Sequence, residues 1–278
     1  MGTLYVVATP IGNIEDLSPR AHRILREVDV IAAEDTRHSG KLLARLGIET
    51  PMISYHAFNE RSRIEMLLER LTNGDVALVS DAGTPAISDP GSAIVRAAAE
   101  AGYPVIAIPG PSALTAAVSV SGFADGPAVF LGFLPRKKGE RTRLLARSFE
   151  TGFAVFFFES PRRVVNTLRE LAAVVPDRET TVFRELTKIY EESVRGSPSQ
   201  LADRLGALDS VKGEIVIGVA GIGDELARHE SEIDLLTDRL CSGMSVSQAA
   251  KEVAALTGIP RSELYDRALQ VRNSAKSV

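Results

Sequence analysis

The sequence is poor in the residues that build cross-linked or metal-clustered frameworks. Its only cysteine is Cys241, which excludes a disulfide framework, a CxxC redox pair and a cysteine-clustered zinc site within one chain. The histidines are His22, His38, His56 and His229, and they show no metal-ligand spacing. We therefore expect no metal site, and the lone cysteine fits a reducing, cytoplasmic location.

The chain also has no excess of positive charge. Its 32 Lys and Arg residues stand against 36 Asp and Glu residues, which gives a formal net charge of −4. Taken alone, this balance argues against a nucleic-acid partner, because such partners usually require a broad basic field.

Several familiar motifs are missing. The sequence contains no GxGxxG, GxxxxGK[ST], HExxH or GxSxG, so dinucleotide dehydrogenases, P-loop enzymes, zincins and α/β-hydrolases lose their support. The start lacks the basic region of a signal peptide. Residues 102–124 carry no charge, but Pro109 and Pro111 interrupt this run, so we expect no membrane span.

The length of 278 residues predicts about two domains and room for a small third. Short apolar runs alternate with amphipathic stretches as far as residue 222, a pattern typical of an α/β protein with a mostly wound sheet. Helical patterns follow and could form a helix-turn-helix-like unit or a packing module. We expect domains at 1–115 and 116–224 and a three-helix domain at 230–278.

The individual elements follow from apolar periodicity and from capping residues such as Ser18 and Ser245. The expected strands are 3–9, 30–33, 75–80, 105–108, 127–132, 154–158, 180–184, 189–194 and 214–219. The expected helices are 19–28, 60–71, 92–101, 112–120, 162–174, 199–208, 233–241, 246–256 and 263–271, the last with Ser262 as its cap.

Loops rich in Gly, Pro, Ser and Asp follow three of the expected strands, at 10–16, 81–91 and 109–112. Ligands of open α/β sheets bind at the carboxyl ends of strands, so these loops are the natural site. Small residues let backbone groups approach a ligand closely, and prolines hold the loops rigid. Such a pocket suits an adenosine and an amino-acid moiety.

A family resemblance rests on motifs spread over residues 9 to 217. These motifs are TPIGNIEDLSPRA, AEDTR, SDAGTPAISDPG, PGPSA, GFLPRK, FFESPRR, RELTK and GEIVI. The chain resembles the bacterial ribosomal small-subunit methyltransferase I family, the 16S ribosomal RNA cytidine 2′-O-methyltransferase branch of the tetrapyrrole methylase superfamily. Gly83-Thr84-Pro85 stands where tetrapyrrole biosynthetic methylases more usually have Gly-Asp-Pro, which favours the RNA branch.

The resemblance implies two α/β domains of the tetrapyrrole methylase (class III methyltransferase) fold, with S-adenosylmethionine held in the cleft between them, and a homodimer. Carried over by motif position, the cofactor-binding residues would be Pro10, Gly12, Ala82, Gly83, Thr84, Pro85, Ile87, Ser112, Ala113, Arg184, Gly213, Glu214 and Ile215. The implied reaction is 2′-O-methylation of a cytidine ribose in the decoding region of 16S ribosomal RNA.

The general base is the least predictable part of such a site, because positioning contributes about 7–11 kcal/mol and a base only about 3–5 kcal/mol. The candidates Glu34, Asp35, Glu60 and Lys188 stay open together with His56 and Glu185. Glu34 could instead form an ion pair with Arg37, Glu60 could be a helix-terminal carboxylate, and Lys188 could act electrostatically. We expect Glu34 and Asp35 to line the acceptor side.

A dense basic segment at 136–147 follows a presumed strand end. Although a charge run usually forms a solvated helix face, this one would face the cleft, so we expect it to contact phosphates. The expected RNA-binding residues are Arg37, Arg136, Lys137, Lys138, Arg141 and Arg143. Two other functions remain open: a tetrapyrrole C-methyltransferase, and an RNA-binding or nucleotide-sensing module that has lost turnover.

Overall fold

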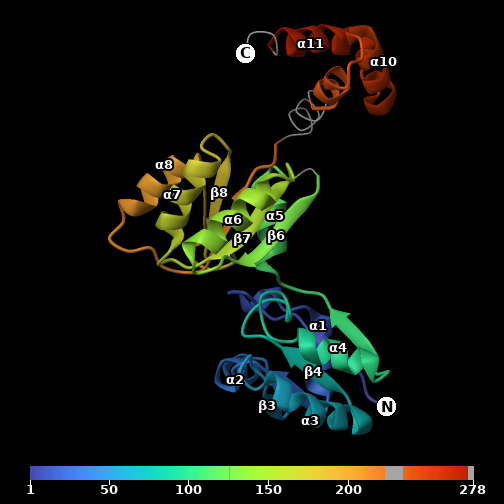
Figure 1. The fold of residues 1–278 in the computed structure, drawn as a ribbon. Helices are drawn as coiled ribbons and strands as arrows, with labels where there is room; N and C mark the ends of the chain where they lie inside the picture. Colours follow the sequence, from blue (N-terminus) through green and yellow to red (C-terminus); the bar gives the residue numbers. More distant parts are fainter. Residues whose placement is uncertain (125, 223–233, 275–278) are drawn as a thin grey trace. The chain divides into compact units, whose positions relative to one another are not determined.

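The structure, a computed structural model, describes residues 1–124, 126–222 and 234–274 (Figure 1). The chain forms two compact units, Met1–Ser148 with Ala154–Ala220, and Phe149–Phe153 with Gly221–Val278. Residues 125, 223–233 and 275–278 lie outside the described residues, and so do the parts of the expected domains that include them.

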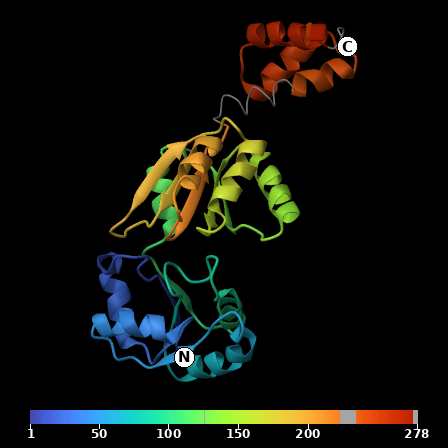
Figure 2. The same ribbon diagram turned by 90° about the vertical axis from the view of Figure 1, so that its left-hand side faces the viewer.

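The amino-terminal half of the first unit is built on a parallel sheet of five strands. Their order is β3-β2-β4-β1-β5, and helices lie on both sides of the sheet (Figure 1, Figure 2). The strands are β1 (Leu4–Val7), β2 (Val30–Ala33), β3 (Met52–Ser54), β4 (Val76–Val79) and β5 (Val105–Ile108). The helices are α1 (Pro19–Glu27), α2 (Thr36–Arg45), α3 (Glu60–Asn73) and α4 (Ser92–Glu100), and a 3₁₀ turn, η1, covers Ile14–Asp16.

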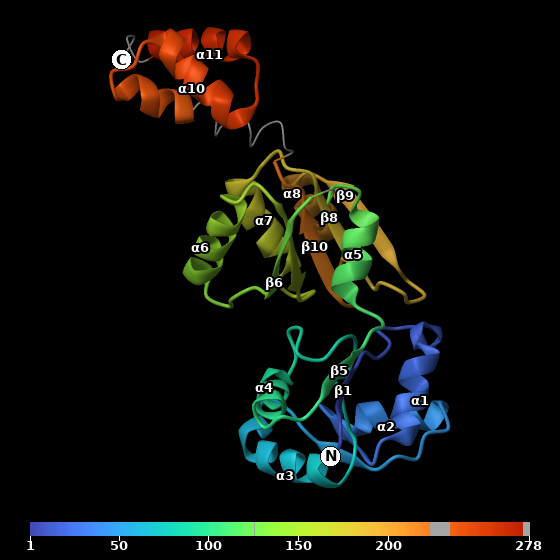
Figure 3. The ribbon, with the colours of Figure 1, turned by 90° about the vertical axis from the view of Figure 1, so that its right-hand side faces the viewer.

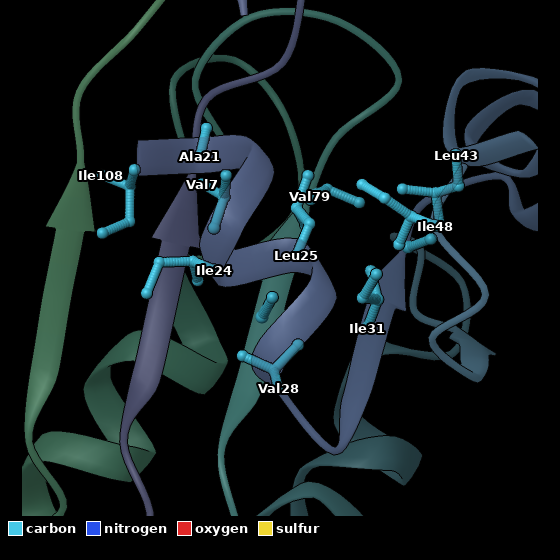
Figure 4. Packing of buried hydrophobic residues seen from close by; sticks show 12 residues of the cluster. Val7, Ala21, Ile24, Leu25, Val28, Ile31, Leu43, Ile48, Val79 and Ile108 are labelled. Atoms are coloured by element: carbon cyan, nitrogen blue, oxygen red, sulfur yellow. The ribbon is translucent and has the colours of Figure 1, made fainter. Parts of the chain in front are cut away.

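Alternating side chains on these strands divide the core into two layers. Ile31 and Ala33 of β2 belong to the layer under α1 and α2, whereas Val30 and Ala32 belong to the layer under α3 and α4. Figure 4 shows Ile24 of α1 among the labelled residues of the first layer. Because both faces are covered, the central strands are entirely apolar, as expected for a parallel sheet.

The second sheet is mixed, with the order β6-β7-β10-β8-β9. Strands β6 and β7 are parallel, and the other neighbours are antiparallel. The strands are β6 (Ala128–Phe133), β7 (Ala154–Glu159), β8 (Thr180–Arg184), β9 (Glu192–Gly196) and β10 (Ile215–Val219). The helices are α5 (Ala113–Ser121), α6 (Lys138–Phe149), α7 (Val164–Val174) and α8 (Pro198–Gly206). Figure 3 shows α5 on the opposite side of this sheet from α6 and α7.

The direction of β10 brings distant parts of the sequence together. Ile215, its first residue, pairs with Glu159 at the end of β7 and with Arg184 at the end of β8. The loop before β10 therefore lies beside the loops that follow β7 and β8, and all three loops lie at the same end of the strands.

The structure differs from the expected elements at several points. Helices α2 and α6 and strand β3 were not predicted, and β9 begins at Glu192 because Ile189 and Tyr190, 95% and 76% exposed, lie in the turn before it. The expected boundary between residues 115 and 116 falls inside α5, which packs on β10 and β7. The expected cap of α1 is confirmed, since the Ser18 side chain accepts from the Ala21 N–H.

The second unit contains a helix over 234–241, α10 (Val246–Thr257) and α11 (Arg261–Ser274). Buried Leu236, Val253 and Leu264 form its core. Ser245 caps α10 as expected, whereas the expected cap Ser262 lies inside α11. The expected start at Ile233 lies outside the described residues. No helix among those described in either unit is long and apolar enough to cross a membrane.

Candidate functional site

A cavity of about 410 Å³ lies where the loops of both sheets converge, a volume typical of small-molecule sites. We call it the main cavity. Most of the expected cofactor residues line it, namely Ala82, Gly83, Thr84, Ile87, Ser112, Ala113, Gly213, Glu214 and Ile215.

Reciprocal hydrogen bonds fix the loops of the first sheet against one another. Thr9 N donates to Gly83 O at 2.9 Å, and Gly83 N donates to Thr9 O at 3.0 Å. Thr84 Oγ1 donates to Pro111 O at 3.3 Å, which joins the third loop to the second. Gly83 has a φ of +78°, a conformation that favours glycine. The sequence therefore encodes a rigid wall of small residues at the strand ends.

Glu60 supports this wall from behind rather than lining the cavity. Its Oε1 accepts from Tyr55 Oη at 2.7 Å and from Gly91 N at 3.0 Å. The two bonds fix the end of the 81–91 loop, where Ala86 and Ser88 have positive φ values of 67° and 66°. These contacts favour a role for Glu60 in positioning the loop over the catalytic role that the sequence predicted.

Three carboxylates from neighbouring strand ends line the main cavity: Glu34, Asp81 and Asp89. Burial raises the pKa of Glu34, whose Oε2 accepts from Asp81 N at 3.4 Å. Burial and the neighbouring Glu34 charge raise the pKa of Asp89 to about 6. Asp81 and Asp89 were not predicted as site residues, although both belong to the SDAGTPAISDPG motif. Among the described residues, no group of His, Cys, Asp and Glu could hold a metal ion.

Asp35, next to Glu34, has a structural role. Its Oδ1 accepts from Arg37 N at 2.8 Å, which caps α2, and its Oδ2 lies 2.9 Å from Arg37 Nη2. The hydrogen bond from the Arg37 side chain lowers the pKa of Asp35. Asp35 lines neither cavity, and its lowered pKa makes it a weaker proton acceptor than Glu34, so its contacts favour a structural role.

Lys188 is held between two carboxylates. Its Nζ lies 2.8 Å from Glu185 Oε1 and 2.9 Å from Glu214 Oε2. Although burial opposes the change, these two hydrogen bonds raise the pKa of Lys188, and its hydrogen bond lowers the pKa of Glu185. Lys188 therefore stays charged and cannot accept a proton, which corrects its place among the candidate bases.

A second cavity of about 320 Å³ adjoins the first. The two cavities share Ile11, Asp81, Ala82 and Glu214. The second is lined in addition by Pro10, Gly12, Ile14, His38, Lys41, Leu42, Arg45 and Lys188. Pro10 and Gly12, expected at the cofactor, thus lie in this second cavity. Pro85 and Arg184 line neither one, and Arg184 pairs with Glu192 at 2.7 Å.

The second sheet supplies a wall that the sequence did not predict. It consists of Phe133, Phe158, Glu159, Ser160, Pro161, Leu186 and Val216. The buried Glu159 accepts from Thr167 Oγ1 and Arg163 Nε, both at 2.7 Å, and from Ser160 N at 2.6 Å. These bonds tie the loop after β7 to the start of α7. Only the antiparallel pairing of β10 brings this wall to the predicted 213–215 segment.

The basic segment over 136–143 divides into exposed and buried residues. Arg136, Lys137, Lys138 and Arg143 are exposed. Arg141 is buried, however, and its guanidinium donates to Glu170 Oε2 at 2.7 Å and Oε1 at 2.6 Å, and to the Pro135 and Arg136 carbonyls. Arg141 therefore anchors the segment, and its contacts favour this role over the expected contact with phosphate.

Comparisons with known proteins place this geometry in a family. The family model "Tetrapyrrole (Corrin/Porphyrin) Methylases" matches residues 3–202, and the model "RsmI C-terminal HTH domain" matches residues 227–272. A protein of Synechocystis sp. named ribosomal RNA small subunit methyltransferase I is 44% identical, over 98% of this chain and 99% of its own. A protein of the same name from Xylella fastidiosa is 46% identical, over 95% and 98%.

Solved structures show the same fold at low sequence identity. A diphthine synthase is 16% identical with a TM-score of 0.61, covering 79% of this chain and 90% of its own. Uroporphyrin-III C-methyl transferase from Thermus thermophilus, complexed with S-adenyl homocysteine, is 22% identical with a TM-score of 0.56, over 78% and 97%. The matches over nearly the full length, the two sheets and the carboxyl-terminal helices all indicate the same family. The chain therefore belongs to the tetrapyrrole methylase family, within its ribosomal RNA small subunit methyltransferase I group.

Proposed function

We propose that this protein transfers the methyl group of S-adenosylmethionine to the 2′-hydroxyl of a cytidine ribose in the decoding region of 16S ribosomal RNA. The observation that carries the proposal is the charge contrast between the two adjoining cavities. The main cavity is lined by acidic residues and by no lysine or arginine, whereas the second is lined by Lys41, Arg45 and Lys188 in addition to the shared Asp81 and Glu214. A cationic ligand suits the first cavity, and a polyanion suits the second.

The residues of the main cavity fit S-adenosylmethionine, which supplies a methyl group on a positively charged sulfur. Glu34, Asp81 and Asp89 surround the place where a cation would be stabilised. The hydrogen bonds between Thr9 and Gly83 do not use the N–H groups of Ala82 and Thr84, which a ligand can approach closely because the neighbouring side chains are small. Ala113 and Ile215 supply apolar surface for an adenine.

The chain would contribute chiefly by alignment. Transfer requires the ribose 2′-oxygen in line with the methyl carbon and the sulfur, so that the C–O bond forms as the C–S bond breaks. The hydroxyl proton passes to a carboxylate, and we assign this role to Glu34. Its raised pKa makes it a better proton acceptor than an ordinary carboxylate, and its Oε2 accepts from the N–H of Asp81, a residue that lines both cavities.

The experiment that tests this function offers two acceptors to the protein with labelled S-adenosylmethionine. One is a small ribosomal subunit that lacks the modification, and the other is a porphyrinoid. Label in RNA supports the proposal, and label in the macrocycle contradicts it in favour of a tetrapyrrole C-methyltransferase. Binding without transfer to either contradicts it in favour of a sensing or binding module. The proposed homodimer is tested separately by the molecular mass in solution.

A further inference from the structure

Three of the basic residues that line the second cavity come from α2. His38, Lys41 and Arg45 follow one another at spacings of three and four residues, so they share one face of the helix. All three are exposed and line the second cavity without lining the main one. We call these three residues the α2 basic face.

The charges of this face are not neutralised by the protein. Over residues 1–124 and 126–222, neither Lys41 nor Arg45 forms an ion pair. The acidic residues of the cavity are engaged elsewhere, since Glu214 pairs with Lys188 and Asp81 accepts from Asp35 N at 3.0 Å. The face therefore presents free positive charge beside a concave surface.

The packing of α2 does not require these side chains. The helix contributes Ser39 and Leu43 to the buried side, and Leu43 belongs to the core layer under α1 and α2. Lys41 and Arg45 can thus be replaced without opening a hole in that layer. Because these two side chains are not needed for packing, their position at the cavity favours a role in binding an anionic ligand.

The position of the cavity limits what that ligand can be. Ile11, Asp81, Ala82 and Glu214 line both cavities, so they form the junction between the α2 basic face and the main cavity. Asp81, one of these shared residues, donates its N–H to Glu34 Oε2 at 3.4 Å, so a ligand that continues from α2 past this junction enters the cavity that Glu34 lines. The arrangement suits a polymer with a negative backbone and a neutral reactive group.

We propose that the α2 basic face binds the phosphodiester backbone of the RNA substrate next to the target nucleotide, so that the target ribose reaches the main cavity at the shared residues. This inference rests on the proposed function and names the surface that holds the acceptor strand. It is separate from the 136–143 segment, since none of the residues of that segment lines the second cavity.

Phosphate contacts have a measurable electrostatic consequence. Each contact with a single strand contributes about −0.7 to the slope of log affinity against log salt. Lys41 and Arg45 lie one helical turn apart and can hold the same phosphate or neighbouring ones. Removing both should therefore reduce the magnitude of the slope by about 1.4 and weaken binding by about 10-fold at low salt.

The test compares two double variants in the full chain. Lys41→Ala/Arg45→Ala removes the charges at the cavity, and Arg61→Ala/Arg96→Ala removes two exposed charges from α3 and α4, which cover the other face of the sheet. Lys41→Gln/Arg45→Gln keeps the side-chain bulk if the alanine variant folds poorly. A fluorescent single-stranded RNA gives the salt slope, and unmodified small subunits give KM and kcat.

We expect the α2 variants to raise KM for subunits by about 10-fold and to lose about 1.4 from the slope, with kcat and S-adenosylmethionine affinity unchanged. The α3/α4 variant should match the wild type. If both double variants bind RNA equally well, the inference is overturned. If the wild type methylates no RNA, the proposed function fails instead, and the salt slopes with the RNA probe still decide whether α2 binds it.

Discussion

The guanidinium of Arg141 forms a two-point hydrogen bond with the carboxylate of Glu170, with N–O distances of 2.7 and 2.6 Å, beneath the exposed basic segment. Both side chains are largely buried, at 9% and 18% exposure. The hydrogen bond to Arg141 lowers the pKa of Glu170. Arg141 thus fixes the segment from its buried side, whereas Arg136 and Lys138 are exposed to a ligand.

Arg141→Ala should therefore reduce stability rather than RNA affinity. Removing one partner leaves the Glu170 carboxylate without its donor, at a cost of about 2–4 kcal/mol. Urea denaturation measures the loss, and the salt slope for RNA should stay within error of the wild type. The neighbouring Lys138→Ala is the matched control, with little effect on stability and a smaller salt slope. An Arg141→Ala variant of full stability and reduced slope would contradict this account.

Glu34→Gln should abolish most of the turnover. The amide cannot accept the hydroxyl proton, so kcat should fall by about 10²–10⁴-fold while S-adenosylmethionine binding changes little. In the wild type, kcat should rise with pH as Glu34 ionises. In the variant, this rise of kcat with pH should disappear. Single-turnover rates across pH measure both effects.

Asp35→Asn is the control for that experiment, because it changes the adjacent carboxylate and keeps a side chain able to cap α2. We expect its kcat to remain within about threefold of the wild type. Equal losses in the two variants would contradict the assignment of Glu34 as the proton acceptor.

Asp89→Asn should change how stability depends on pH. The pKa of Asp89 rises from 3.8 to about 6, so the folded protein binds this proton more tightly than the unfolded chain does. The contribution of Asp89 to stability is thus fully present below pH 3.8 and is lost as the pH rises through about 6. The free energy of unfolding of the variant minus that of the wild type should therefore be larger at about pH 7.5 than at about pH 4.5. Urea denaturation at the two pH values measures this difference. A difference between the two proteins that is the same at both pH values would refute this.

Gly12→Ala should disturb the second cavity. A Cβ at this position would collide with Cγ of Lys188, whose Nζ holds Glu185 and Glu214. We expect a loss of about 1–3 kcal/mol in stability and weaker RNA binding. Gly139→Ala, where a Cβ would meet nothing within 4 Å, is the control and should change stability by no more than about 1 kcal/mol. Unchanged RNA binding in Gly12→Ala would argue against the second cavity as a binding site.

Local sequence patterns predicted most of the fold but missed helices α2 and α6 and strand β3. Helix α2 contains Ser39 and Gly40, residues that weaken a helical pattern, and Gly40 is suited to the close approach of Met52 on β3, whose Cε would lie 3.3 Å from a Cβ there. Strand β3 has only three residues, too few for a clear alternation. Both are stabilised by tertiary packing, which a sequence window does not contain.

The sequence predicted the parts of the candidate site that single loops form, and it missed the parts that depend on the pairing of distant strands. The loops that contain Gly83 and Ala113 follow their strands directly, so composition was enough to find them. Glu159 and Leu186 join the cavity only because β10 runs antiparallel to its neighbours, and this pairing was not encoded in any single motif. The motifs also carried no information on which carboxylates were already engaged, as Asp35 and Glu60 are.

The central claim is tested most directly by locating the transferred methyl group. Small subunits that lack the modification would be incubated with the protein and isotopically labelled S-adenosylmethionine, and their 16S RNA digested and mapped by mass spectrometry. The account predicts label on the 2′-oxygen of a single cytidine in the decoding region. Label on a base, or on the ribose of another nucleotide, would contradict it.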